Sequence, residues 1–177
     1  LKRNQKGYYE HPDSEIDVAC INVSKWYSES LGTMFLELEK FIDFDFEKIY
    51  AGQKILFVGY PKGFFDTKNF LPVVRSGSIA SIPSIDFEGR KQLLIDAQVF
   101  PGSSGSPVFT IIGGEYKLLG IISEVPIRPL DFLDVPVEKS TNANEKSEKN
   151  EVSIPIQFIG LGMLFKSGTI KEVFDLV

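Results

Sequence analysis

Short apolar runs separated by polar turns make up most of this 177-residue chain, and such runs predict strands. The clearest run covers residues 53–60, where Ile, Leu, Phe and Val follow one another. Further strands are predicted at 17–23, 71–81, 92–97, 108–112, 117–125 and 154–165. Hairpin turns are predicted at 86–90 and at Gly113-Gly114. The pattern therefore predicts an all-β fold.

Two segments interrupt this pattern. Residues 30–50 mix helical spacing with the alternation of Phe41 to Phe46, which predicts a linker or short helix leading to an edge strand. At the end of the chain, Thr169 is predicted to cap a short helix over 170–176 that places its apolar residues on one face.

Residues 137–153 carry almost nothing apolar, and their charges nearly balance. Such a stretch cannot bury enough surface to offset its ordering entropy, so it is predicted to be a mobile surface insertion.

Composition narrows the function classes. An apolar content of 43% is enough for a core, and a net charge of −5 without a basic stripe argues against a nucleic-acid partner. No apolar run approaches the roughly 18 residues of a membrane span, so no membrane partner is expected. The single Cys20 cannot form an internal disulfide, so nothing demands an oxidising compartment, and a cytoplasmic location is preferred.

The stretch from Phe100 to Phe109 carries the candidate chemistry. Two glycines bracket a pair of serines, and Pro107 with an apolar run follows at once. Such a tight loop can present the Ser104 hydroxyl as a nucleophile, with the backbone N–H groups of Gly102 and Ser104 as an oxyanion hole. Taken alone, a Gly/Ser/Pro cluster more often marks an ordinary loop.

The wider segment 95–107 resembles the active-serine segment of trypsin-like peptidases, most closely the bacterial HtrA-type branch. That branch has Asp-Ala, three residues, and then Pro-Gly-Asn-Ser-Gly-Gly-Pro. Asp96-Ala97 stands at the matching spacing, and Ser104 falls at the nucleophile. The sequence departs from the pattern at Ser103 and Ser106. The resemblance implies that the loop backbone of Gly102, Ser103 and Ser104 forms the oxyanion hole.

Asp17-Val18-Ala19 resembles the family motif whose Asp orients the catalytic histidine. A carboxylate heading an apolar strand is costly without a partner, which agrees with this role. The only histidine, His11, lies six residues before Asp17, whereas the family's base lies some tens of residues upstream of its Asp. The base is therefore expected outside this sequence; His11 as the base and a protein without a base remain the alternatives.

The resemblance also implies a substrate site. Gln98 stands at the floor of the specificity pocket with Val99 beside it, and Ser123, Glu124 and Val125 would face the substrate. Peptides would bind by strand addition to the segment 123–125. Without an acidic residue at the pocket floor, preference for small or medium uncharged side chains is expected.

The implied fold is a double six-stranded β-barrel of the trypsin type with a short C-terminal helix. Residues 1–65 would form the C-terminal part of a first, incomplete barrel, and 66–177 a second barrel with the nucleophile loop and the polar insertion. No PDZ-like domain is expected to follow. The implied function is a serine endopeptidase acting on polypeptides through an acyl-enzyme, with no metal or other cofactor.

Two other functions stay open. One is an inactive peptidase-fold protein that binds extended peptides or partners. The other is an unrelated β-barrel interaction module with a coincidental Gly-Ser loop.

Overall fold

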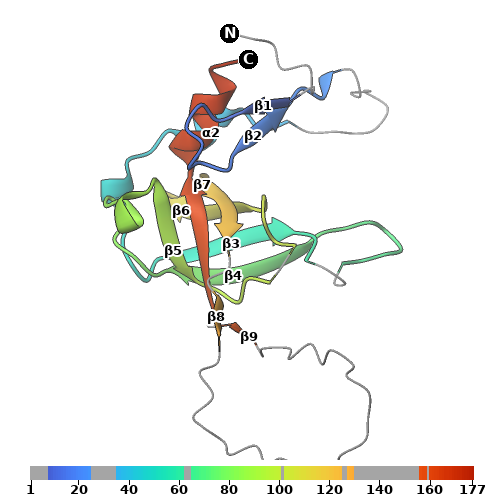
Figure 1. Ribbon diagram of the computed structural model, residues 1–177, viewed down its shortest axis with the longest axis vertical. Helices are drawn as coiled ribbons and strands as arrows, with labels where there is room; N and C mark the ends of the chain where they lie inside the picture. Colours follow the sequence, from blue (N-terminus) through green and yellow to red (C-terminus); the bar gives the residue numbers. More distant parts are fainter. Residues whose placement is uncertain are drawn as a thin grey trace, which may run out of the picture.

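The computed structural model describes residues 8–24, 35–61, 65–100, 102–124, 127–129, 156–158 and 160–177. Six antiparallel strands close a barrel in the order β10-β5-β4-β3-β6-β7 (Figure 1). They are β3 (Lys54–Gly59), β4 (Val73–Ile79), β5 (Gln92–Asp96), β6 (Pro107–Ile112), β7 (Glu115–Glu124) and β10 (Leu161–Lys166). The predicted all-β trypsin-type fold is confirmed as a mostly-β structure with a closed six-stranded barrel and a short C-terminal helix; of the predicted double barrel, the described residues form one closed barrel.

The barrel interior is the main core, because alternate residues of each strand point to the same face. The buried residues include Ile55 and Phe57 of β3, Leu93 and Ile95 of β5, and Leu119 and Ile122 of β7. Gly120 allows β7 and β10 to approach closely, since a Cβ at this position would collide with the backbone carbonyl of Phe165. The barrel is therefore a continuous hydrogen-bonded and packed unit.

The sequence places the strand over 53–60 in a different barrel from the strands that follow it, and the structure contradicts that placement. β3 pairs along its whole length with β4, from Lys54 opposite Ser78 to Gly59 opposite Val73. It also pairs with β6. The boundary predicted between residues 65 and 66 thus falls within one barrel. An apolar run indicates that a strand is buried, but it does not specify the strands with which it pairs.

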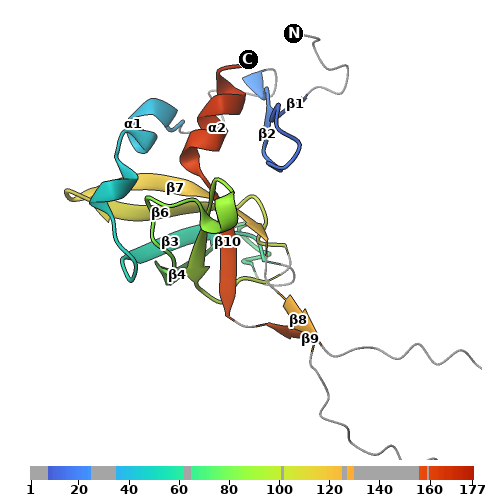
Figure 2. The same ribbon diagram turned by 60° about the vertical axis from the view of Figure 1, so that its left-hand side comes forward.

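A second, smaller layer lies above the barrel, where the hairpin of β1 (Tyr8–Glu10) and β2 (Ala19–Ile21) packs on α2 (Ser167–Phe174) (Figures 1 and 2). The buried residues of this layer come from the hairpin, β10 and α2: Ile16, Val18, Phe165 and Val173. The hairpin and helix are thus joined to the barrel through Phe165 of β10.

At the opposite end of the barrel, β8 (Ile127–Pro129) pairs with β9 (Ile156–Phe158). The single strand predicted over 154–165 is therefore two strands, β9 and β10. Gly160 lies between them with a φ of 75°, a conformation that glycine adopts without strain. The predicted insertion at 137–153 lies outside the described residues.

The edge strand predicted after residue 40 is also wrong. The segment forms α1 (Leu38–Ile42) and the 3-10 turn η3 (Phe46–Lys48). Phe44 and Phe46 pack on the barrel core with their ring centroids 4.9 Å apart. The alternation of aromatic and acidic residues in this segment therefore arises because two phenylalanine side chains anchor it to the barrel core, and it does not indicate a strand. A second 3-10 turn, η4 (Phe87–Gly89), stands at the predicted hairpin turn.

Thr169 does not cap α2, which begins two residues earlier at Ser167. Its side chain is fully buried, and its hydroxyl donates to the carbonyl of Lys166 at 2.8 Å. The threonine thus satisfies a backbone acceptor within the first turn. Of the helices in the described part of the chain, none is long and apolar enough to cross a membrane.

Candidate active site

The loop between β5 and β6 consists of two successive turns. The N–H of Ser103 donates to the carbonyl of Phe100 at 3.0 Å, and the N–H of Ser106 donates to the carbonyl of Ser103 at 3.0 Å. Gly102 and Gly105 occupy the third position of each turn, with φ of 91° and 82°. A positive φ at this position is typical of a type II turn and favours glycine. The spacing of the two glycines therefore sets the shape of the loop.

Backbone hydrogen bonds fasten the second turn to β7. Gly105 N–H donates to the carbonyl of Ile122 at 2.7 Å, and Ile122 N–H donates to the carbonyl of Ser106 at 2.9 Å. On the other side, Gly59 of β3 leaves room for the Ser106 side chain, whose hydroxyl would collide with any Cβ there. The loop is thus held by the barrel wall at both faces.

Ser104 lies at the exposed tip of the second turn. Its hydroxyl donates to the backbone carbonyl of Ser123 in β7 at 3.1 Å. Within the described residues, no histidine or carboxylate is hydrogen-bonded to this hydroxyl. Ser104 is therefore accessible, but its proton has no basic acceptor here.

The backbone N–H groups of the loop differ in availability. No hydrogen bond of the described residues uses the N–H of Gly102 or of Ser104, whereas the N–H of Ser103 is engaged by Phe100. The sequence-based inclusion of Ser103 among the oxyanion donors is therefore wrong, because its N–H closes the first turn. Gly102 and Ser104 are the two remaining donors.

Asp17 lies between two buried residues, Ile16 and Val18, just before β2. Because neighbouring residues of an extended segment point to opposite sides, its carboxylate is exposed. No hydrogen bond or ion pair within the described residues involves this carboxylate, and none joins it to Ser104. It is free to accept a hydrogen bond from an added group.

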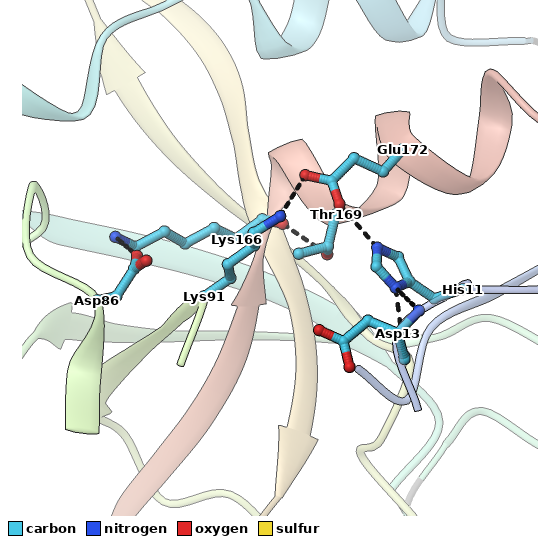
Figure 3. A network of polar contacts seen from close by, with 7 residues as sticks. All are labelled: His11, Asp13, Asp86, Lys91, Lys166, Thr169 and Glu172. Carbon is cyan, nitrogen blue, oxygen red and sulfur yellow. Dashed lines mark hydrogen bonds and ion pairs between the residues drawn. The ribbon is translucent and has the colours of Figure 1, made fainter. Parts of the chain in front are cut away.

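His11 takes part in a different contact, shown in Figure 3. The ring is buried, at 8% exposure. Its Nε2 lies 2.8 Å from Oε2 of Glu172 in α2, and its Nδ1 accepts the N–H of Asp13 at 3.0 Å. Since Nδ1 is an acceptor, the proton of the neutral ring is on Nε2 and is donated to Glu172. Both ring nitrogens are thus engaged away from Ser104.

Glu172 also binds a cation, Lys91. The Nζ of Lys91 lies 2.6 Å from its other oxygen, Oε1. The hydrogen bond from Lys91, and then the one from His11, lower the pKa of Glu172 below its usual value. The carboxylate therefore joins the hairpin, the helix and the start of β5.

The residues predicted to line the substrate site have different surroundings. Gln98 and Glu124 are exposed, whereas Val99 is 1% exposed and belongs to the barrel core. Val99 is therefore not a surface residue of a binding pocket; its side chain fills the space beside Gly162 of β10. Val125 lies outside the described residues.

Ser123 is a bulged residue of β7. Glu124 is opposite Met163 and Ile122 is opposite Leu164, so Ser123 has no counterpart on β10. Its hydroxyl donates to the carbonyl of Met163 at 3.3 Å. The bulge explains how the Ser123 carbonyl comes to face Ser104.

The end of β7 has an open edge. β6 begins at Pro107, opposite Ile121, so in the described part of the chain Ser123 and Glu124 have no β6 partner. An unpaired strand end next to a nucleophile can accept an extended peptide through main-chain hydrogen bonds.

The sequence analysis missed one residue near the loop, because it belongs to no recognisable motif. Arg75 of β4 lies against Phe100, with its guanidinium carbon 4.9 Å from the ring centroid. The sequence signal that could have identified Arg75 is a charged residue at an inward-facing position of an apolar strand.

Comparison with known proteins identifies the family of this chain. A search of curated proteins found no match. The family model described as the trypsin-like peptidase domain matches residues 2–121, which is more than half of the chain and includes both Asp17 and Ser104. The chain therefore belongs to the trypsin-like peptidase domain family.

Proposed function

We propose that this protein is a serine endopeptidase in which Ser104 is the nucleophile and Asp17 orients the catalytic imidazole. Membership of the peptidase family supports action on polypeptides. The observation that carries the proposal is the exposed Ser104 hydroxyl at the tip of a tight turn, beside the N–H groups of Gly102 and Ser104, which no described residue engages.

In the first step, Oγ of Ser104 attacks the scissile carbonyl carbon, and its proton passes to the imidazole. The negative oxygen that forms is stabilised by the N–H groups of Gly102 and Ser104, each contributing about 3 kcal/mol in comparable enzymes. The imidazolium then protonates the leaving amine as the C–N bond breaks. Water hydrolyses the remaining ester and restores the serine.

The base in this proposal is a histidine outside the 177 residues. His11 is unsuited to the role because Glu172 and Asp13 engage its two nitrogens. The Asp17 carboxylate, exposed and without a partner in the described chain, would accept the imidazole's second N–H. Ser104 must also exchange its hydrogen bond to Ser123 for one to the base.

The substrate is proposed to be an extended polypeptide added to the edge of β7 at Ser123 and Glu124. The exposed, uncharged Gln98 favours small or medium uncharged side chains at the cleavage site. We also propose that the protein belongs to the HtrA-type branch of the family, because its serine segment has the spacing of that branch. A peptide library cleaved mainly after Lys or Arg would contradict this specificity.

The test is labelling of the full-length protein with a fluorophosphonate probe, followed by peptide mass spectrometry. We expect the label on Ser104, its loss in Ser104→Ala, and its retention in Ser106→Ala, which removes the neighbouring buried hydroxyl. No label in the folded full-length protein would overturn the proposal.

The second candidate is an inactive peptidase-fold protein that binds extended peptides. It is favoured by the engagement of His11 and by the bond from Ser104 to the Ser123 carbonyl, which together leave the hydroxyl without a base. This candidate would be supported if the full-length protein does not react with the fluorophosphonate probe but still binds extended peptides. The binding should be lost in Glu124→Pro, which blocks the edge of β7.

A further inference from the structure

Arg75 lies close to two aromatic rings. It lies directly opposite Phe57 in the pairing of β4 with β3, and its guanidinium carbon is 5.4 Å from the Phe57 ring centroid. The same carbon also lies 4.9 Å from the ring centroid of Phe100. Phe57 is 2% exposed and belongs to the barrel core. The stack therefore runs from the core to the first residue of the nucleophile loop.

The charge of Arg75 has no carboxylate partner among the described residues. Its Nη1 is buried and donates no hydrogen bond to any described residue. A buried donor without an acceptor opposes folding, so a neutral side chain of similar length would fill the position at lower cost. The faces of the two rings attract the cation and offset part of this cost. The arginine is thus tied to aromatic partners, of which one belongs to the loop.

Phe100 links this stack to the site through its backbone. Its carbonyl accepts the N–H of Ser103 and so closes the first turn. That turn contains Gly102, whose N–H is one of the two proposed oxyanion donors, and it leads directly into Ser104. The Phe100 side chain is 40% exposed, so the contact with Arg75 lies at the edge of the barrel core.

We propose that Arg75 is a positioning residue for the nucleophile loop, which it holds in shape through Phe100. This inference rests on the proposed function, because it gives the first turn a part in catalysis. The planar guanidinium spans the two rings, and neither an ammonium nor an apolar chain reproduces this arrangement.

The first test measures exchange of single backbone amides by NMR in the full-length protein. Arg75→Met keeps most of the stem but removes the charge and the plane. We expect exchange of the Ser103 amide to accelerate about tenfold, while the Ile122 amide, which donates to Ser106, changes less than about twofold. Arg75→Lys should give an intermediate value. Arg90→Met, at an exposed arginine, is the matched control and should leave both amides unchanged.

The second test follows the reaction. In Arg75→Met we expect kcat to fall about tenfold with KM within about twofold, because the loop acts on the transition state and not on peptide binding. Equal acceleration of both amides would assign Arg75 to general barrel stability and overturn the proposal. The proposal would also be overturned if the exchange rate of the Ser103 amide did not change, or if the loss of activity appeared only as a higher KM.

The two proposals fail separately. Absence of labelling at Ser104 in the wild type overturns the peptidase function, whereas amide exchange reports on the turn in an active or an inactive protein.

Discussion

Ser104 and His11 are the two residue types that a serine peptidase pairs, yet here they have opposite surroundings. The Ser104 side chain is exposed and, within the described part of the chain, makes one hydrogen bond, to a backbone carbonyl. His11 is buried, and each ring nitrogen has a partner. A buried and fully partnered polar group contributes to stability, whereas an exposed group with few partners remains available for chemistry.

The carboxylates show the same contrast. Glu172 binds Lys91 and His11, and these contacts lower its pKa. Asp17 stands exposed, with no partner among the described residues. The junction of the β1–β2 hairpin with α2 is thus complete as a structural contact. The Asp17 carboxylate makes no such contact within the described residues, so it could take part in the proposed catalytic site only through a further group.

The largest effect on stability is expected for His11→Ala, which removes both ring contacts and leaves the Glu172 oxygen without its donor. The free energy of unfolding should fall by about 2 kcal/mol, measured by urea denaturation. His11→Gln and His11→Asn, which each retain one of the two contacts, should lose less. Ser104 should label at the wild-type rate in the folded variant; loss of labelling would make His11 the base.

A smaller loss is expected for Gly105→Ala. No atom lies within 4 Å of the added Cβ, so the cost comes from the positive φ alone, about 1 kcal/mol. Fluorophosphonate labelling of Ser104 should slow by at least about tenfold, because a shift of the turn misplaces the hydroxyl. Gly89→Ala, at a φ of 75° outside the loop, is the matched control and should lose similar stability with normal labelling.

Glu172→Gln tests the junction of the β1–β2 hairpin with α2 through the pH dependence of stability. The pKa of Glu172 is lowered in the folded state, so its stabilising contribution is present above its unfolded value of 4.5 and is lost as pH falls through the lower folded value. Unfolding free energies measured from about pH 6 to pH 3 should therefore decline less in Glu172→Gln than in the wild type. Because the side chain is 42% exposed, solvent reduces the difference. An identical decline would contradict the contact, and Glu88→Gln serves as the exposed control.

Ser104→Ala should have the smallest effect on stability and the largest on reactivity. The exposed hydroxyl makes one hydrogen bond, so unfolding should change by no more than about 0.5 kcal/mol. Labelling should disappear completely. Together with His11→Ala, this variant separates the two regions, and a large loss of stability in Ser104→Ala would remove the distinction.

By itself, the sequence determined most of the barrel strands and the shape of the loop, because both depend on nearby residues. Apolar alternation marks which residues face a core, and the three-residue spacing of Gly102 and Gly105 permits two successive turns with Ser104 at the tip. The same local reasoning correctly predicted the hairpin at Gly113-Gly114. These features follow from the chirality and the two-residue period of the backbone.

Only the tertiary structure decided what lies opposite each element. It placed β3 in the same barrel as β4 and β6, Val99 in the core, and the Ser103 N–H in a turn. It also brought His11 to Glu172, 161 positions away, and Arg75 to Phe100. Pairing and burial depend on contacts between distant segments, whose energies no local pattern contains.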